Sequence, residues 1–521
     1  MPEAKTARRG LLLRFLDGVE RVGNALPDPI TLFALFALLV ILVSWLATAA
    51  DVSAVHPGTG ETVRAVNLLS AEGIRRMLTE AVRNFAAFPP LGLVIVVIIG
   101  IGVMEHSGLI GVALKALVGS VPRSLLTATI VFAGIMSNVA VDAGYVVLTP
   151  LGAMIFAGVG RHPLAGLAAA FAGVSAGFSA NLLITSLDPL LSGLSQEAAQ
   201  LVDPDYIVLP TANYWFMIVS VFLLTGLGTF VTSRFVEPRL GVWDPTHGEG
   251  LEDEVRLTDV SQRERRALMA AGIAFVAFIL LILPLVLPRN GILRDPQAVA
   301  DNAPIYVQLQ PFFGSIVTLL MLLFLVTGIV YGWVAGTIRS DRDVAKMASQ
   351  GVAVLGSYIV LAFAAAQFVA YFGWSNLGLI LAINGAELLR SAGFTGIPLL
   401  LSFILVAAFI NLFIGSSSAK WAVMAPVFVP MLMLTGYSPE VTQAAYRVGD
   451  SSTNIITPLL QYFPVIIAFA QKYDRKAGMG TLISSMLPYS VAFIIGWSLL
   501  FTIWMIGGWE LGPGAPLHYE P

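Results

Sequence analysis

The sequence has no cysteine and few charged residues for its length. Without cysteine, the 521-residue chain cannot form disulfides or bind a metal through thiolates. Only 12% of its residues are charged and the formal net charge is -3, so we expect no basic surface for nucleic acid. By contrast, 57% of the residues are hydrophobic and the mean hydropathy is +0.83. This composition is typical of an integral membrane protein embedded in a lipid bilayer.

The chain also lacks the motifs of several enzyme classes. It contains neither H-E-x-x-H nor G-x-x-x-x-G-K-[ST], which argues against a zinc protease and an ATP-driven pump. The segment "GVSAG" (173–177) matches a nucleophile elbow, but it lies within an apolar run instead of between a strand and a helix. Gly173 and Gly177 are more typical of a face on which two membrane helices pack closely. We therefore predict that the protein is not an enzyme and holds no cofactor beyond a coupling ion.

Long apolar runs predict nine membrane-spanning helices. A bilayer core about 30 Å thick needs roughly 20 apolar residues per helix. The runs near this length are 30–50, 90–105 with its flanks, 164–187, 213–233, 267–287, 311–335, 351–372, 441–471 and 484–507. Before them, segment 1–29 does not resemble a cleavable signal peptide, and its residues 10–25 are expected to form an interfacial helix. The expected fold is an all-α polytopic membrane protein.

Two further apolar stretches, 121–159 and 399–435, carry polar residues at their centres. These residues lie in "MSNVAVDAGY" (136–145) and "GSSSAKWA" (415–422). Such a segment is excluded from lipid unless protein or a water-filled cavity surrounds it. Each stretch is therefore predicted to be a re-entrant hairpin, in which two short helices meet at a polar tip.

The positions of Lys and Arg fit this topology with a cytoplasmic N-terminus. Cytoplasmic loops normally hold the excess of basic residues, and the predicted cytoplasmic segments hold 20 of the 29. The first hairpin then enters from the cytoplasm and the second from the opposite face. The expected organisation is a first membrane half at 30–234, a charged cytoplasmic linker at 235–266, a second half at 267–507 and an external tail at 508–521.

Prolines and Ser-x-Asn sequences recur at the same spacing in both halves. Each half contains two prolines 13 residues apart, which are Pro150 and Pro163, then Pro426 and Pro439. A Ser-x-Asn follows each pair, at Ser179 and Asn181, then at Ser452 and Asn454. If the match is not coincidental, the intervening crossings make it an inverted repeat with two broken helices, 164–187 and 441–471. Secondary transporters have this architecture, with their site near the midplane where the breaks face each other.

Ionisable residues within the apolar runs are the first candidate site residues. At membrane depth such groups mark substrate or ion pathways, because burying them is costly. They are Asp142 at the first hairpin tip, Asp188 after the first break, and Arg447 and Asp450 before the second. Arg447 could bind an acidic substrate through its two-pronged guanidinium, or it could neutralise Asp450 as an i,i+3 pair. Asp188 could instead serve a loop or a helix end.

Neutral oxygens near the breaks are candidate cation ligands. Unwound segments offer such oxygens to Na+, and the candidates are Asn138, Ser179, Ser417 and Ser452, together with the carboxylate of Asp142. A proton on Asp142, Asp188 or Asp450 is the alternative coupling ion. Lys420 weakens a cation site beside it unless its side chain reaches a carboxylate or water.

Three more residues near the breaks are candidates for substrate binding. Asn181 and Asn454 offer amide groups at the two breaks. Trp421, next to Lys420, either stacks on an aromatic substrate or lies in an interfacial belt.

Long motifs of the chain resemble the aminobenzoyl-glutamate transporter family, AbgT. The motifs are "GRHPLAGLAAAFAGVSAGFSANLLITSLDPLLSG" (160–193), "AFINLFIGSSSAKWAVMAPVFVPMLMLTGYSPEVTQAAYRVGDSSTNIITPLLQYF" (408–463) and "GTLISSMLPYS" (480–490). The similarity runs from "LPDPITLF" (26–33) to "GPGAP" (512–516), nearly the whole chain.

This resemblance implies a function and a set of site residues. It implies a homodimer with nine membrane helices and two hairpins per subunit, placed around an aqueous basin in the inner membrane. It also implies uptake of p-aminobenzoyl-glutamate, or export of p-aminobenzoate and sulfonamide antimetabolites. The family's functional residues match Asp188, Trp421, Pro439 and Arg447, with Asp450 close by. We therefore expect an ion-coupled secondary transporter of aromatic acids; the alternatives are uptake of other carboxylates, or a channel built on the hairpins.

Overall fold

The computed structural model describes most of the chain. The described residues are 27, 29–55, 60–119, 122–139, 144–243, 260–303, 305–353, 355–457, 460, 462–475 and 477–520. The predicted interfacial helix at 10–25, Asp142 and much of the predicted linker lie outside them.

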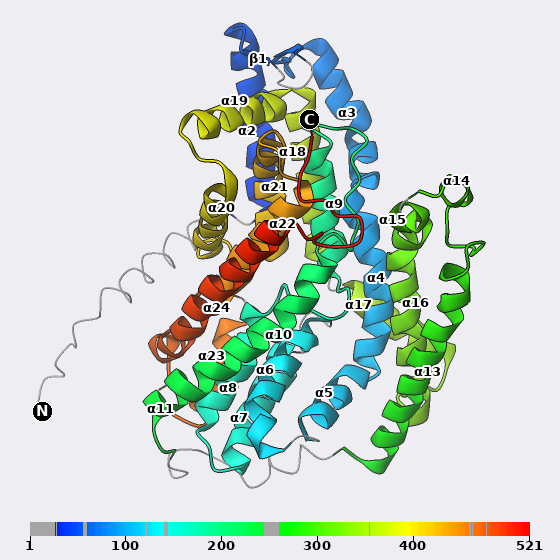
Figure 1. The fold of residues 1–521 in the computed structure, drawn as a ribbon, viewed down its shortest axis with the longest axis vertical. Coiled ribbons are helices and arrows are strands. Elements are labelled where there is room, and N and C mark those ends of the chain that lie inside the picture. Colours follow the sequence, from blue (N-terminus) through cyan, green and yellow to red (C-terminus); the bar gives the residue numbers. More distant parts are fainter. Residues whose placement is uncertain are drawn as a thin grey trace, which may run out of the picture.

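The described chain is mostly helical, as its composition predicts (Figure 1). By length and apolar composition, six helical segments of the described residues could cross a membrane. They are α2 (Pro29–Ala49), α3 with α4 (Ala71–Ala86, Pro89–His106), α10 with η5 and α11 (Tyr214–Val231, Thr232–Val236, Glu237–Leu240), α13 (Gln262–Val286), α16 (Gln310–Ala335) and α24 (Met479–Gly507). A seventh is formed by α17 (Asp341–Ala353) and α18 (Gly356–Trp374), which are bent by 47°.

The other two predicted spans are broken into shorter helices. The first consists of α8 (Pro163–Phe171), the π-helical turn η4 (Ala172–Ala176), a non-helical stretch and α9 (Leu187–Ala199). The second consists of α22 (Pro439–Thr453), the 3-10 turn η8 (Asn454–Ile456), a break and α23 (Phe463–Gln471). Pro163 and Pro439 each stand at the first helical position, where a missing N–H costs nothing. These two interruptions explain why length alone identifies fewer spans than the nine predicted.

Helix α9 is longer than the sequence prediction allowed. We placed the end of the first broken helix at 187, yet α9 runs on to Ala199, beyond the predicted span. Polar residues such as Ser192 and Ser195 interrupt the apolar run, but both are buried inside the protein. An apolar-run criterion misses such a helix because protein, and not lipid, surrounds it.

Each predicted hairpin contains two short helices separated by polar residues. The first contains α6 (Leu126–Met136), η2 (Ser137–Val139), η3 (Gly144–Leu148) and α7 (Thr149–Gly158). The second contains α20 (Gly396–Asn411) and α21 (Ser417–Met433). Their re-entry from opposite faces of the membrane stays a prediction.

The two broken helices begin at opposite ends of the molecule and meet at their breaks. Arg161, just before α8, donates from Nε to Glu237 Oε1 of α11 at 2.8 Å. Ser438, just before α22, donates its N–H to the Leu517 carbonyl of the C-terminal segment at 3.2 Å. Figure 1 shows α11 at the lower end and the C-terminus at the upper end. Asn454 Nδ2 donates to the Ser175 carbonyl at 3.2 Å, which joins the two breaks as an inverted repeat requires.

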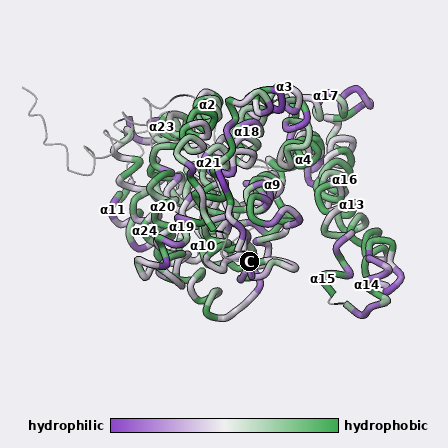
Figure 2. Tube along the Cα trace, turned by 90° about the horizontal axis from the view of Figure 1, so that it is seen from above, coloured by the Kyte–Doolittle hydropathy of each residue, from purple (hydrophilic) through white to green (hydrophobic). Residues whose placement is uncertain are grey.

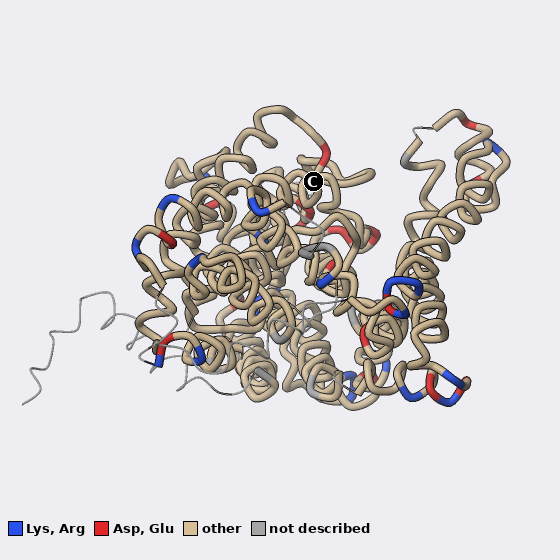
Figure 3. The backbone as a smooth tube through the Cα atoms, turned by 90° about the horizontal axis from the view of Figure 1, so that it is seen from below, with Lys and Arg blue, Asp and Glu red and all other residues tan. Residues whose placement is uncertain are grey.

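The remaining elements surround this central pair. Helix α16 packs on α4 and α13, and these helices form one side of the molecule with the short helices α14 (Pro296–Ala300) and α15 (Ile305–Gln308) (Figure 2). Helix α5 (Leu109–Gly119) and the 3-10 turn η1 (Arg123–Leu125) lead into the first hairpin, while α19 (Leu377–Ser391) packs on α21. Charged positions are sparse along the long helices (Figure 3).

The sequence did not predict two features of the fold. Strands β1 (Ser53–Val55) and β2 (Thr62–Arg64) form an antiparallel hairpin with Ser53 opposite Arg64. The predicted external tail at 508–521 folds back on the protein, with Leu511 fully buried and accepting a hydrogen bond from the Phe216 N–H at 3.1 Å. Such short segments, which contain no apolar run, are placed by contacts with the rest of the chain.

A valine at Gly173 is expected to destabilise the packing of the first hairpin. Close packing at Gly173 was predicted and is confirmed, because an added Cβ would meet the Val131 carbonyl oxygen and lie 3.0 Å from the Gly134 Cα of α6. Overpacking of this kind costs about 1–3 kcal/mol, so the unfolding midpoint of the detergent-solubilised Gly173→Val variant should fall. Gly226→Val is the control, since nothing lies within 4 Å of its added Cβ. Equal midpoints for the two variants would contradict the prediction.

Candidate functional site

A buried ion pair joins the two halves of the protein. Arg447 Nη2 of α22 lies 2.6 Å from Asp188 Oδ1 in the first turn of α9, and the side chains are 2% and 0% exposed. The Thr185 N–H also donates to Asp188 Oδ2, at 2.6 Å, so this carboxylate organises the chain entering α9. Among the described residues, Arg447 Nε has no hydrogen-bond partner. The guanidinium therefore retains donor capacity for a second carboxylate.

Asp450 has a different partner from the one considered in the sequence. The i,i+3 pairing of Arg447 with Asp450 is wrong, because Asp450 forms its ion pair with Lys420 of α21. Both side chains of this pair are fully buried. Lys420 Nζ also donates to Asn411 Oδ1 of α20. Lys420 thus reaches a carboxylate, which neutralises its charge. Its presence therefore does not argue against a cation site nearby.

Asn411 and Ser417 hold the second hairpin against its broken helix. Asn411 Nδ2 donates to the Asp450 carbonyl at 2.6 Å and to Asn454 Oδ1 at 2.9 Å. Ser417 Oγ donates to Asp450 Oδ2 at 2.9 Å. The tip of the hairpin and the second break therefore form one hydrogen-bonded unit, whose charge is balanced by Lys420.

Trp421 is buried within the protein and does not lie in an interfacial belt. Its ring stacks on Tyr446 with centroids 4.4 Å apart and an interplanar angle of 28°. Its Nε1 donates to Ser195 Oγ of α9 at 3.0 Å, and Ser195 donates to Gln443 Oε1 of α22 at 2.6 Å. Trp421 thus ties α21 to α9 and α22.

Neutral oxygens gather at the first break. Asn138 and Asn181 both donate their Nδ2 to the Ile135 carbonyl, at 3.1 and 3.2 Å, which brings the first hairpin tip to the break. Asn138 Oδ1 and Ser179 Oγ are buried without a hydrogen-bond partner among the described residues. Ser452 Oγ, by contrast, donates to the Val448 carbonyl of its own helix at 2.7 Å. Of the four predicted cation ligands that the structure describes, Asn138 and Ser179 have an oxygen without a hydrogen-bond partner among the described residues.

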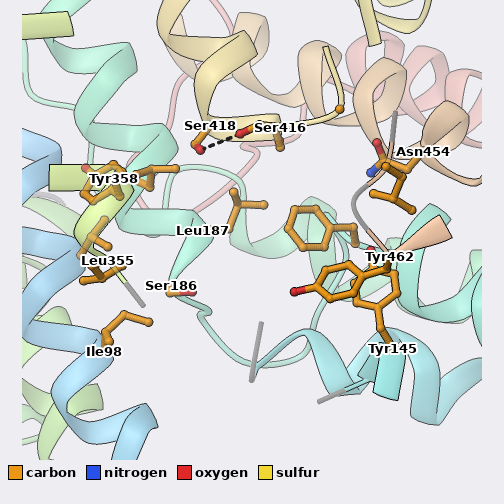
Figure 4. Close-up of a pocket in the computed structure, with 16 residues that line it drawn as sticks. Ile98, Tyr145, Ser186, Leu187, Leu355, Tyr358, Ser416, Ser418, Asn454 and Tyr462 are labelled. Atoms are coloured by element: carbon orange, nitrogen blue, oxygen red, sulfur yellow. Dashed lines mark hydrogen bonds between the residues drawn. The ribbon is translucent and has the colours of Figure 1, made fainter. Parts of the chain in front are cut away.

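A cavity of about 410 Å³ lies where the two breaks and the second hairpin tip meet (Figure 4). Phe178 and Ser186 line it from the first break, and Asn454 from the second. Ser416 and Ser418 line it from the hairpin tip, and Ser186 and Leu187 immediately precede Asp188 in the chain. Asp188 and Arg447 do not themselves line the cavity, but Leu187, which does, directly precedes Asp188. The walls are mostly apolar with a few polar groups, as in ligand sites.

Pro439 has a place in the helix, not in the cavity. It begins α22, eight residues before Arg447, which corresponds to about 12 Å along an α-helix. Its contribution is to start the helix that carries Arg447 and Asp450.

The sequence prediction missed several residues of this region. Asn411, Tyr446, Gln443 and Ser195 are buried polar residues with side-chain partners far away in the chain. Their signal in the sequence is a polar residue within an apolar or small-residue segment, which is too frequent to single them out. Lys420 gave the clearest signal, because a lysine within an apolar hairpin needs a buried partner.

Two solved transporters share the fold of this chain. The YdaH transporter of Alcanivorax borkumensis is 46% identical, with a TM-score of 0.87 over 94% of this chain and 100% of its own. MtrF of Neisseria gonorrhoeae, described within a class of antimetabolite efflux pumps, is 46% identical, with a TM-score of 0.91 over 97% of this chain and 99% of its own. These similarities confirm the prediction of an all-α polytopic membrane protein.

A curated relative and a family model agree with the solved structures. The p-aminobenzoyl-glutamate transport protein of Escherichia coli (strain K12) is 38% identical over 496 residues, which are 95% of this chain and 95% of the relative. Because the relatives are transporters, the prediction that the chain is not an enzyme is confirmed. Residues 14–519 match the model of the AbgT putative transporter family, and this chain belongs to that family.

Proposed function

We propose that this protein is an ion-coupled secondary transporter that exports p-aminobenzoate-like aromatic acids and sulfonamide antimetabolites. The observation that carries this proposal is the Arg447–Asp188 ion pair beside a cavity formed by both breaks. A substrate carboxylate that enters the cavity can pair with the Arg447 guanidinium in place of Asp188, and the coupling ion, a proton or Na+, then compensates the freed charge of Asp188. The names of the relatives supply the substrate class: p-aminobenzoyl-glutamate for one, antimetabolites for another.

The exchange of partners at Arg447 provides a route to alternating access. Asp188 begins α9 and Arg447 lies on α22, so the ion pair joins the two inverted halves. When the substrate carboxylate takes the place of Asp188, the two halves lose one of their links. Rocking of the halves about a central site is the motion that inverted repeats permit.

The coupling ion is Na+ or a proton. In the Na+ case, Asn138 Oδ1 and Ser179 Oγ are the leading ligands, because a cation would satisfy two buried oxygens that have no partner among the described residues. Asp142, Ser417 and Ser452 complete the predicted set. In the proton case, Asp188 or Asp450 would take up the proton as its basic partner is released.

We also propose the membrane in which the protein lies, the side of its N-terminus and its oligomeric state. The basic residues favour a cytoplasmic N-terminus, and the family resemblance favours the inner membrane and a homodimer. Native mass spectrometry of the detergent-solubilised protein measures the assembly, and a monomer would contradict this part of the proposal.

Flux of labelled p-aminobenzoate in proteoliposomes tests the function. Gradients of Na+ and of pH are imposed separately, with each sign, on vesicles of known protein orientation. We expect accumulation against the substrate gradient under one ion gradient, in the direction that corresponds to export. Flux that only dissipates the substrate gradient favours a channel. Accumulation in the opposite direction, or of non-aromatic carboxylates alone, favours an uptake transporter.

A further inference from the structure

Two tyrosines stack face to face in the wall of the cavity. Tyr145 and Tyr462 both line it, with ring centroids 4.2 Å apart and an interplanar angle of 11° (Figure 4). Tyr145 lies in η3 of the first hairpin, whereas Tyr462 directly precedes α23 after the second break. The stack therefore joins segments from opposite halves of the protein within the cavity.

Trp421 is poorly placed to bind the ring of a substrate. It is fully buried, it is not among the residues that line the cavity, and its ring is stacked on Tyr446. Its Nε1 is bonded to Ser195. An aromatic ring in the cavity must therefore find its partner among the rings that line it. These belong to Tyr145, Phe178, Tyr358 and Tyr462, of which Tyr145 and Tyr462 already stack on each other.

A substrate ring can exchange with one ring of the stack at little cost. Aromatic rings prefer offset stacking, and a ring inserted between or against the tyrosines restores the contact that it displaces. In Figure 4 the tyrosines lie on one side of the cavity and the second hairpin tip lies on another, where Ser416 and Ser418 supply hydroxyl groups 3.3 Å apart. This arrangement offers π-faces on one side and hydrogen-bonding groups on the other, which matches a ring with a polar end.

We infer that Tyr145 and Tyr462 form the slot that selects an aromatic ring over a saturated ring of the same charge. This inference rests on the proposed function and identifies the residues that recognise the ring. Arg447 would then bind the carboxylate group of every substrate, while the tyrosine slot discriminates between aromatic and saturated rings. The tyrosine hydroxyl groups are not required for stacking, so phenylalanine should replace either tyrosine.

Binding of benzoate and cyclohexanecarboxylate to the purified protein tests the slot. Both acids are monoanions with six-membered rings, and isothermal titration calorimetry measures each Kd. We expect the unaltered protein to bind benzoate more tightly. In Tyr145→Leu and Tyr462→Leu, benzoate binding should weaken about fivefold while cyclohexanecarboxylate binding changes little. Tyr145→Phe and Tyr462→Phe should retain the original ratio.

One control variant and one labelling experiment distinguish a specific role of the slot from a general loss of structure. Phe363→Leu removes the T-shaped contact with Phe85, with centroids 5.6 Å apart. Phe363 is exposed and neither residue lines the cavity, so both Kd values should stay unchanged. The cysteine-free sequence also permits Tyr462→Cys with a membrane-impermeant thiol reagent, whose reaction benzoate should slow more than cyclohexanecarboxylate.

The outcomes distinguish this inference from the proposed function. If the leucine variants keep the unaltered ratio of Kd values while p-aminobenzoate flux persists, the slot is wrong and the transport function stands. If the ratio depends on the tyrosines but no gradient drives flux, the slot stands and the transport function fails. An unaltered protein that binds neither acid overturns both.

Discussion

Arg447→Ala is expected to abolish transport and to lower the free energy of unfolding by about 3–5 kcal/mol, because it leaves Asp188 as an unpaired charge in a fully buried position. Substrate binding would be lost as well, since the proposed carboxylate clamp is removed. Transport is measured as p-aminobenzoate flux in proteoliposomes at matched protein levels, and stability as the midpoint of unfolding in detergent.

The double variant Arg447→Met/Asp188→Leu separates the two roles of the pair. Removing both charges eliminates the unpaired group, so much of the stability should return while transport stays absent. Arg447→Lys keeps the charge but loses the planar fork that holds a carboxylate in two bonds, so it should bind substrate more weakly than the unaltered protein. Normal flux in Arg447→Ala at normal protein levels would refute the role assigned to this residue.

Lys420→Met is the second change with a large expected effect. Lys420 is the cation paired with Asp450, and both side chains are fully buried. Removing it leaves a carboxylate without a counter-ion between the second hairpin and the second broken helix. We expect the free energy of unfolding to fall by about 3–5 kcal/mol and transport to be lost, because the hairpin tip is no longer held at the break.

Two comparisons test the explanation given for Lys420. Lys420→Met/Asp450→Leu should recover most of the stability, because no uncompensated charge is left. Arg64→Ala breaks an ion pair with Asp51 whose side chains are 66% and 78% exposed, so its midpoint should change little. A Lys420→Met variant as stable as Arg64→Ala would show that the buried pair has no structural role.

The helices and their interruptions were largely predictable from local sequence. Apolar runs predicted α2, α10, α13, α16, α18 and α24, because burial in a bilayer demands a long uninterrupted apolar helix. The Ser-x-Asn sequences marked both breaks, since polar residues within an apolar run must be enclosed by protein or water. Helix α9 was missed for the complementary reason, because a helix enclosed by protein needs no apolar run.

The candidate site was only partly predictable. Its charged members, Asp188, Arg447 and Asp450, stand out in the sequence because ionised groups are rare at membrane depth. The sequence does not reveal which of these residues form ion pairs with each other. The i,i+3 spacing made Asp450 an obvious partner for Arg447, yet Asp188, 259 residues away, is the partner in the folded protein.

The amino-acid sequence alone was sufficient to establish a polytopic helical membrane protein of the AbgT family with two interrupted helices. Hydrophobic burial in lipid and the exclusion of polar groups from it are local, additive effects that each segment displays by itself. The partners of Arg447, Lys420 and Trp421, and the stack of Tyr145 on Tyr462, were decided by the tertiary structure. Such contacts depend on which distant side chains meet once the two halves enclose a low-dielectric interior, where an ion pair or a ring stack forms only if both partners arrive there.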